Sequence, residues 1–224
     1  CKYYENYKKC EYYLKVFKLY RYIMKICFIT CLFANSYSEV DKPVKFNKNS
    51  NYDYYLFTNL SKDDFNTSWD VVNISDTFNN TNIDSNIIKS RYPKFMSWKL
   101  LKDVLNKEYD VIFYCDAQYT PRDNVDWESC AKRVIDHPSG IMQQQHIRDA
   151  YLETIEIFKE KKDSNVNCNK TLKFLTSNKF PKNFPMQTNT TFAYNPNNKL
   201  LINALSDFWD TYSKYEISHR DQPI

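Results

Sequence analysis

Short runs of apolar residues recur along most of the chain, separated by stretches with helical spacing. These runs predict strands at residues 25–34, 52–59, 69–75, 109–116, 139–146 and 186–196. The run at 109–116 (YDVIFYCD) is almost continuously apolar and ends in a carboxylate. Continuous apolarity is typical of a central strand that is covered on both faces.

Apolar residues spaced three and four apart predict helices between the strands. The patterns place them at 88–107, 125–136, 147–162 and 198–215. In the first of these, Pro93 is compatible with a helix only if it lies in the first turn. Residues 163–171 (DSNVNCNKT) are polar and predict a loop.

Strands that alternate with helices predict an α/β domain with a mixed, mainly parallel sheet flanked by helices. We expect this domain to span residues 24–224 and to continue beyond residue 224, with residues 1–23 as a basic, tyrosine-rich appendage. In such sheets ligands bind beyond the carboxyl ends of the central strands. Asp116, at the end of the most apolar run, is therefore the first candidate site residue.

Composition excludes several classes of function. The chain has 224 residues but one glycine, Gly140, which excludes the dinucleotide fingerprint and the phosphate-binding P-loop because both need several glycines in one turn. A net charge of +4, spread along the chain, argues against a nucleic-acid partner. Seven cysteines without paired spacing indicate reduced, buried thiols instead of disulfides or a zinc site.

Residues 24–34 (MKICFITCLFA) have two readings. A basic residue, an apolar run and a small-residue end resemble a signal segment, whereas the content of Ile, Phe, Cys and Thr favours a buried first strand. We prefer the strand and expect a cytoplasmic protein, with the secretory lumen as the alternative. No run reaches the roughly 20 apolar residues of a membrane span, so we expect no integral membrane span.

The first candidate chemistry is a phosphate site. Asp116 could hold a divalent cation that bridges phosphates, or it could cap the turn at Thr120. Arg91 and Lys94, three residues apart near the expected helix start, could clamp a diphosphate together with the helix N-terminus. The alternative is a solvated basic helix face with Ser90 as the N-cap.

Two further polar segments follow predicted elements. His146 could contact sugar or phosphate at the rim of the crevice, with Arg148 beside it and Glu153 on the next helix. The alternative is a polar strand end and a surface helix.

The second segment is HRDQ, which follows an amphipathic helix. Asp221 could be a general base, His219 a second metal ligand beside Asp116, and Gln222 a ligand-binding residue. The alternative is a charged turn near a chain terminus.

The order of the segments YDYYLFTN, SRYPKFMSWKLL, YDVIFYCDAQ, QQQHIRDAYLE, TNTTFAYNPNNK and HRDQP resembles the glycosyltransferase-like domain family. That family includes plant turgor-regulation and mucilage-related Golgi transferases and many bacterial and viral relatives. The resemblance covers about residues 25 to 224. It implies a GT-A-like fold, a nucleotide-sugar donor and transfer of the sugar to an acceptor.

By position, the resemblance assigns roles to the same candidates. The family's basic pair before the central strand corresponds to Arg91 and Lys94, and its acid at the strand end corresponds to Asp116. Its His-Arg-acid segment corresponds to His146, Arg148 and Glu153, and its closing RDQ corresponds to Arg220, Asp221 and Gln222. The sequence Asp116-Ala117-Gln118 lacks the second Asp of a full DxD metal motif. Dependence on Mn²⁺ or Mg²⁺ then requires His219 or another residue to complete the coordination.

The resulting expectation is a glycosyltransferase that acts on a glycan, protein or lipid acceptor. Thr30, Asn35 and Asn59, near the ends of the first strands, would hold the donor nucleotide. The basic pair, with a cation at the strand-end carboxylate, would neutralise the departing diphosphate, and Asp221 or Glu153 would orient or deprotonate the acceptor. The alternative is a non-catalytic carbohydrate- or nucleotide-binding module on the same fold.

Overall fold

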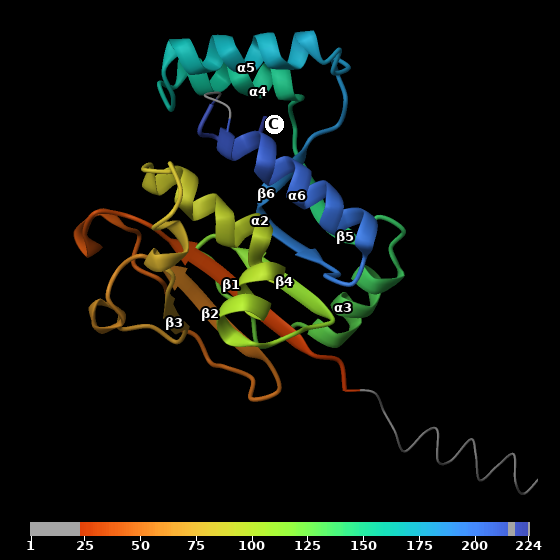
Figure 1. Ribbon diagram of the computed structural model, residues 1–224. Helices are drawn as coiled ribbons and strands as arrows, with labels where there is room; N and C mark the ends of the chain where they lie inside the picture. The colour runs from red at the N-terminus through yellow and green to blue at the C-terminus, as the bar shows by residue number, and fades with distance from the viewer. Residues whose placement is uncertain (1–22, 215–217, 224) are drawn as a thin grey trace, which may run out of the picture.

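Figure 1 shows the computed structural model of the protein, which describes residues 23–214 and 218–223. The expected appendage at 1–23 therefore lies outside the described residues, apart from Ile23. The strands are β1 (Ile26–Leu32), β2 (Asp53–Thr58), β3 (Asp70–Asn73), β4 (Val111–Cys115), β5 (Ile141–Gln145) and β6 (Gln187–Tyr194). Each of them falls within a run that the sequence predicts to be a strand.

The strands form one six-stranded sheet in the order β3-β2-β1-β4-β6-β5. β1 pairs in parallel with β2 and with β4, and β3 pairs in parallel with β2. β6 runs antiparallel to both of its neighbours, β4 and β5. The prediction of a mixed, mainly parallel sheet flanked by helices is confirmed, and this sheet is compatible with a GT-A-like fold.

The helices are α2 (Asn86–Leu105), α3 (Trp127–Asp136), α4 (Ala150–Lys159), α5 (Asn165–Ser177) and α6 (Lys199–Lys214), with short 3₁₀ turns η1 (Tyr37–Glu39), η2 (Lys62–Asp64) and η3 (Ser75–Phe78). In Figure 1, α2 and α6 lie over one face of the sheet, and α4 and α5 lie side by side beyond it. Side chains of α3 pack on the other face.

Alternation along the strands creates these two cores. In β1, Cys27, Ile29 and Cys31 belong to the cluster with α2 and α6, whereas Ile26 and Phe28 belong to the cluster with α3. Successive side chains of a strand point to opposite faces, so a continuously apolar strand serves both layers. Residues 24–34 thus contain a central strand of the sheet, as the preferred reading expects.

The start of α2 differs from the prediction. The helix begins at Asn86, and Ser85 is its N-cap, with a side chain that accepts from the Ile88 N–H. Pro93 therefore lies in the helix interior, and the backbone leaves helical dihedral angles at Met96 (φ −112°, ψ 21°). Because proline cannot donate a backbone hydrogen bond, an interior position disturbs the helix. The expectations of Pro93 in the first turn and of Ser90 as the N-cap were wrong.

The loop predicted at 163–171 is also wrong, since α5 begins at Asn165. Its apolar face is short: Cys168, Thr171 and Leu175 are its buried residues. The start signal was present in the sequence, because the Ser164 side chain accepts from the Asn167 N–H as an N-cap. The many asparagines of this segment obscured it.

The cysteines within the described residues are free; Cys27, Cys31 and Cys168 are buried, as the sequence predicts, whereas Cys115 and Cys130 are only partly buried. Among the helices of the described residues, none has the length and apolar character needed to cross a bilayer.

Candidate functional site

Lys94 joins two of the three carboxylates that the sequence singles out, Asp116 and Asp221. Its Nζ lies 2.9 Å from Oδ2 of Asp221 and 3.7 Å from Oδ1 of Asp116. The Arg91 Nε lies 2.9 Å from the other oxygen of Asp221. Residues widely separated in the sequence therefore meet in one group, which we call the Lys94 cluster: Arg91, Lys94, Asp116 and Asp221.

The Lys94 cluster is largely shielded from solvent. The Lys94 side chain is 4% exposed and that of Asp221 is 8% exposed, so the alternative of a solvated basic helix face is excluded for Lys94. Asp116 is the most accessible member, with its side chain 34% exposed. Asp221 contacts both cations at ion-pair distance. Neither the Arg91 Nε nor the Asp221 Oδ2 has a partner in hydrogen-bond geometry among the described residues.

Burial and charge act in opposite directions on Asp221. Burial raises the pKa of this carboxyl, but Lys94 and Arg91 outweigh it and lower the pKa to about 2. For the Arg91 guanidinium, burial lowers the pKa, and Asp221 outweighs this and raises it above its usual value. A general base works best with a pKa near the working pH. The electrostatics therefore favour an orienting role for Asp221.

Position in the sheet explains why these residues meet. The strand order reverses between β1 and β4, and ligands of open α/β sheets bind beyond the carboxyl ends at such a switch point. Cys31, near the end of β1, donates from Sγ to the Ser90 carbonyl oxygen at 3.0 Å. This contact fixes the part of α2 that carries Arg91 and Lys94 beside those strand ends. Because α2 begins at Asn86, its N-terminus does not supply the charge that we expected there.

Tyr114 belongs to the site, although it is not among the candidate residues predicted from the sequence. Its hydroxyl donates to Oδ1 of Asp116 at 2.7 Å and lies 3.7 Å from the Cys31 Sγ. The signal was available, because Tyr114 precedes Asp116 by two residues and side chains two apart in a strand share a face. Asp116 thus faces Tyr114 and Lys94 with its side chain, and its backbone carbonyl accepts from the Tyr119 N–H in the turn.

The segment 218–223 is held in place by specific contacts. The Asp221 carbonyl accepts from Asn189 Nδ2 at 3.1 Å, and Oε1 of Gln222 accepts from the Asn189 N–H at 3.0 Å. Gln222 Nε2 also donates to the Gln187 carbonyl. Ser218 is 1% exposed and Asp221 is 6% exposed, so the alternative of a charged, solvated terminal turn is wrong for these residues.

His146, Arg148 and Glu153 form a second polar group. Arg148 Nη1 donates to Oε2 of Glu153 at 2.9 Å, and His146 Nε2 lies 3.8 Å from the same oxygen. The His146 N–H donates to the Met186 carbonyl beside β6. The contacts of Gln222 with β6 place this group near the closing segment, but its charged atoms pair with one another and not with the Lys94 cluster.

His219 contacts a different carboxylate from the one expected. Its Nδ1 lies 3.2 Å from Oδ1 of Asp163, whose Oδ2 accepts from the Ser218 hydroxyl at 2.6 Å. Burial raises the pKa of Asp163, but hydrogen bonds from Ser218 and Asn167 outweigh it and lower the pKa. In this arrangement His219 anchors the closing segment to the start of α5.

The expected nucleotide-binding residues have different surroundings. Thr30 is fully buried, and its hydroxyl has no partner within the described part of the chain. Asn59 uses both ends of its amide on Ala34, donating at 2.8 Å and accepting at 3.1 Å, and so ties the end of β2 to that of β1. Asn35 is exposed, and its Oδ1 accepts from Asn86 at 3.0 Å. Of the three, Asn35 is the one that faces solvent.

Within the described residues, the Lys94 cluster offers a cation one accessible carboxylate, that of Asp116. Across residues 23–214 and 218–223, no group of three or more His, Cys, Asp or Glu side chains is arranged to hold a metal ion. Oδ1 of Asp116 is engaged by Tyr114, which leaves Oδ2 open among the described contacts. One carboxylate together with phosphate oxygens and water is a usual environment for Mg²⁺. Asp116 therefore fits a cation that arrives with a diphosphate.

Comparison of the chain with protein-family models and with curated proteins gave no match. The resemblance to the glycosyltransferase-like family rests on the segments quoted above and on their order in the chain.

Proposed function

We propose that the protein is a glycosyltransferase that moves a sugar from a nucleotide-diphosphate donor to a glycan, protein or lipid acceptor. The observation that carries the proposal is the Lys94 cluster at the β1/β4 switch point. It combines two cations with a partly exposed carboxylate at the edge where open α/β sheets bind ligands. A sheet compatible with a GT-A-like fold supports the same reading.

Charge balance indicates how a donor would bind. The cluster contains two positive and two negative side chains, so it offers no net positive charge to a diphosphate. The Asp116 carboxylate would hold a Mn²⁺ or Mg²⁺ ion bound to the donor, and such an ion supplies the missing positive charge. Lys94 and Arg91 would then lie beside the diphosphate, with Asp221 keeping both cations in position.

The transfer step uses these side chains as follows. The bond between the anomeric carbon and the phosphate oxygen breaks, and its electron pair stays on the diphosphate. Lys94 and Arg91 stabilise this growing negative charge. The acceptor oxygen bonds to the anomeric carbon and loses its proton. Glu153, held by Arg148, is the carboxylate that we assign to take that proton.

The test is binding of UDP and GDP to the full chain, with and without MnCl₂, measured as a shift in melting temperature. A ligand at 100 times its Kd stabilises by about 2.7 kcal/mol, which raises Tm by roughly 5 to 10 °C for a protein of this size. We expect one nucleotide to produce such a shift and Asp116→Asn to abolish its Mn²⁺-dependent part. Asp103→Asn, at an exposed carboxylate of α2, is the matched control.

Turnover completes the test. Release of UDP or GDP from nucleotide-sugars should be detected for the wild-type chain and lost in Asp116→Asn. A chain that binds neither nucleotide and releases none would contradict the transferase proposal. The pairing of both cations with Asp221 favours a second candidate, a non-catalytic binding module, and binding without turnover would support it.

A further inference from the structure

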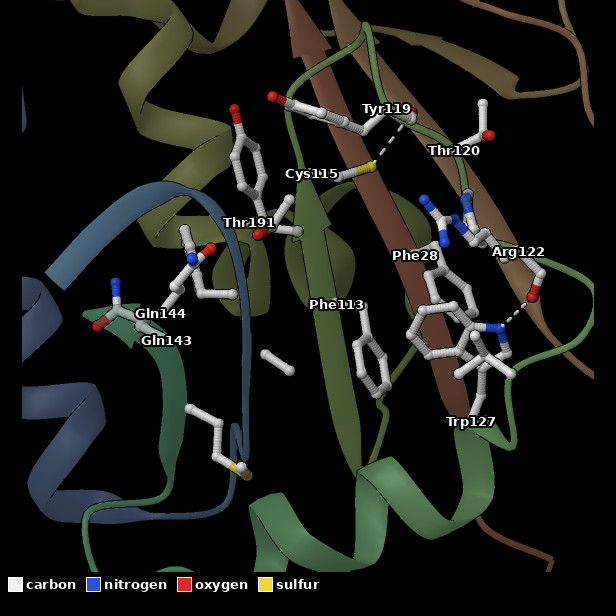
Figure 2. A pocket seen from close by; sticks show the side chains of 16 residues that line it. Phe28, Phe113, Cys115, Tyr119, Thr120, Arg122, Trp127, Gln143, Gln144 and Thr191 are labelled. Atoms are coloured by element: carbon white, nitrogen blue, oxygen red, sulfur yellow. Dashed lines mark hydrogen bonds between the residues drawn. The ribbon is translucent and has the colours of Figure 1, made fainter. Parts of the chain in front are cut away.

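A cleft of about 440 Å³ lies over β4, β6 and β5, on the face of the sheet against which α3 packs. Figure 2 shows Phe113 in the centre, with Gln143 and Gln144 on one side and Trp127 and Arg122 on the other. We call it the β4–β6 cleft. Its volume lies within the range of small-molecule sites, which combine an apolar floor with a few polar groups. No pattern along the sequence indicates this cleft.

The floor of the cleft is aromatic. Phe113 stacks on Phe28 with ring centroids 5.0 Å apart and meets Trp127 edge-on at 5.2 Å. Phe113 and Trp127 are both partly exposed, so ring surface is available to a ligand. An aromatic face carries partial negative charge. The C–H groups of a sugar ring, made partly positive by neighbouring oxygens, pack favourably against such a face.

The polar lining is mostly uncharged. Thr120, Gln144 and Thr191 line the cleft, and each can both donate and accept hydrogen bonds, as sugar hydroxyls do. Among the residues that the structure describes, neither the Gln144 amide nor the Arg122 guanidinium has a hydrogen-bond or ion-pair partner. Arg122 is the one charged residue among the described residues that line the cleft. Apart from Arg122, the lining combines neutral donors and acceptors with an aromatic floor, and this combination suits a polyhydroxylated ligand.

The cleft reaches the strand ends that carry Asp116. Cys115 and Thr191 both line it and are paired across β4 and β6. The next residue, Asp116, donates its N–H to the Thr190 carbonyl at 2.9 Å. A ligand that lies along β4 therefore has one end beside the edge where the donor site is proposed.

We propose that the β4–β6 cleft is the acceptor site and that it binds a saccharide whose ring packs on Phe113 and Trp127. The role as acceptor site rests on the proposed function, whereas saccharide binding itself needs neither donor nor turnover. It selects the glycan among the three classes of acceptor.

The experiment is saturation-transfer NMR on the full chain, without nucleotide, with cellotriose, mannotriose and chitotriose as probes. We expect transfer to the ring C–H protons of at least one trisaccharide. Phe113→Leu keeps apolar volume but removes the ring, and it should weaken binding about 3- to 10-fold. Gln144→Ala, at an exposed side chain that leaves the core intact, should weaken it about 2- to 10-fold.

Two matched controls define the result. Phe158→Leu, at an exposed ring of α4, and Gln145→Ala, at an exposed neighbour that does not line the cleft, should bind as the wild type does. Absence of transfer to all three sugars, or transfer unchanged in both cleft variants, would overturn the inference. Dodecanoate tests whether the cleft is instead a site for an alkyl chain. If dodecanoate binds the wild type and binds Phe113→Leu equally well, the inference is overturned, because a site for an alkyl chain tolerates leucine. Failure of UDP and GDP to bind would contradict the transferase alone and leave saccharide binding in place.

Discussion

Asp221→Asn is the substitution that tests the Lys94 cluster most directly. Asparagine keeps the size of the side chain but removes the negative charge that faces Lys94 and Arg91, each 2.9 Å away. The side chains of both cations are mostly buried, at 4% and 17% exposed, so neither can turn fully into water. The substitution therefore leaves two shielded positive charges beside each other.

Two estimates give the size of the effect. Removing one partner of a buried ion pair destabilises a protein by about 3 to 5 kcal/mol. The pKa gives a second value: Lys94 and Arg91 lower it from 3.8 to about 2 in the folded protein, and a shift of that size corresponds to roughly 2 to 3 kcal/mol in favour of the ionised carboxylate. We expect the free energy of unfolding at pH 7 to fall by about 2 to 5 kcal/mol.

The pH dependence has a definite sign. The pKa of Asp221 is depressed by folding, so its contribution is fully present above about pH 4 and is lost as the pH falls through about 2. The difference in stability between the wild type and Asp221→Asn should therefore be constant from pH 7 to about pH 4. It should shrink between about pH 4 and pH 2.

Urea unfolding followed by tryptophan fluorescence measures these differences. Asp210→Asn is the matched control, because that carboxylate is exposed and pairs with Lys214 on the surface of α6. It should change stability by less than about 0.5 kcal/mol. Adding Lys94→Met to Asp221→Asn should recover part of the loss by removing one uncompensated charge. A cost for Asp221→Asn no larger than that of Asp210→Asn would refute the electrostatic account of the cluster.

Two further predictions follow from local structure. Gly140→Ala should lower the free energy of unfolding, measured in urea, by about 2 kcal/mol or more. The reason is that Gly140 has φ +68° and an added Cβ would lie 2.5 Å from Asn198 Nδ2. An unchanged free energy of unfolding would show that this turn can relax. Burial raises the pKa of Cys31 to about 11 and that of Cys115 to about 12, so iodoacetamide at pH 8 should leave both thiols unmodified in the native chain and modify them in urea, as read by peptide mass spectrometry. Rapid native labelling of Cys115 would contradict the second prediction.

Much of the fold could be predicted from local patterns. The apolar run that became β4 is continuous because the strand packs against side chains on both faces, and this same feature placed Asp116 at the carboxyl edge of the sheet. The start of α2 could not be predicted in the same way, because Ser85 and Ser90 are both plausible caps and only packing of the whole helix selects one. The helix α5 was missed because its buried face consists of few residues among asparagines.

The candidate site shows the same division. Residue type and position marked Arg91, Lys94, Asp116 and Asp221, because charged side chains next to apolar elements stand out in a sequence. Local pattern carries no information about which opposite charges meet. The pairing of Asp221 with both cations depends on how the closing segment crosses β6, through the contacts of Asn189 and Gln222.

The sequence by itself determined the order of the strands, the helices other than α5 and the carboxylate at the end of β4, because these depend on the spacing of neighbouring residues. Only the tertiary structure decided that Asp221 is a buried counter-ion, that His219 pairs with Asp163, and that a cleft lies over Phe113. Each of these depends on contacts between segments far apart in the chain, and such contacts are fixed by the packing of the sheet and its helices as a whole.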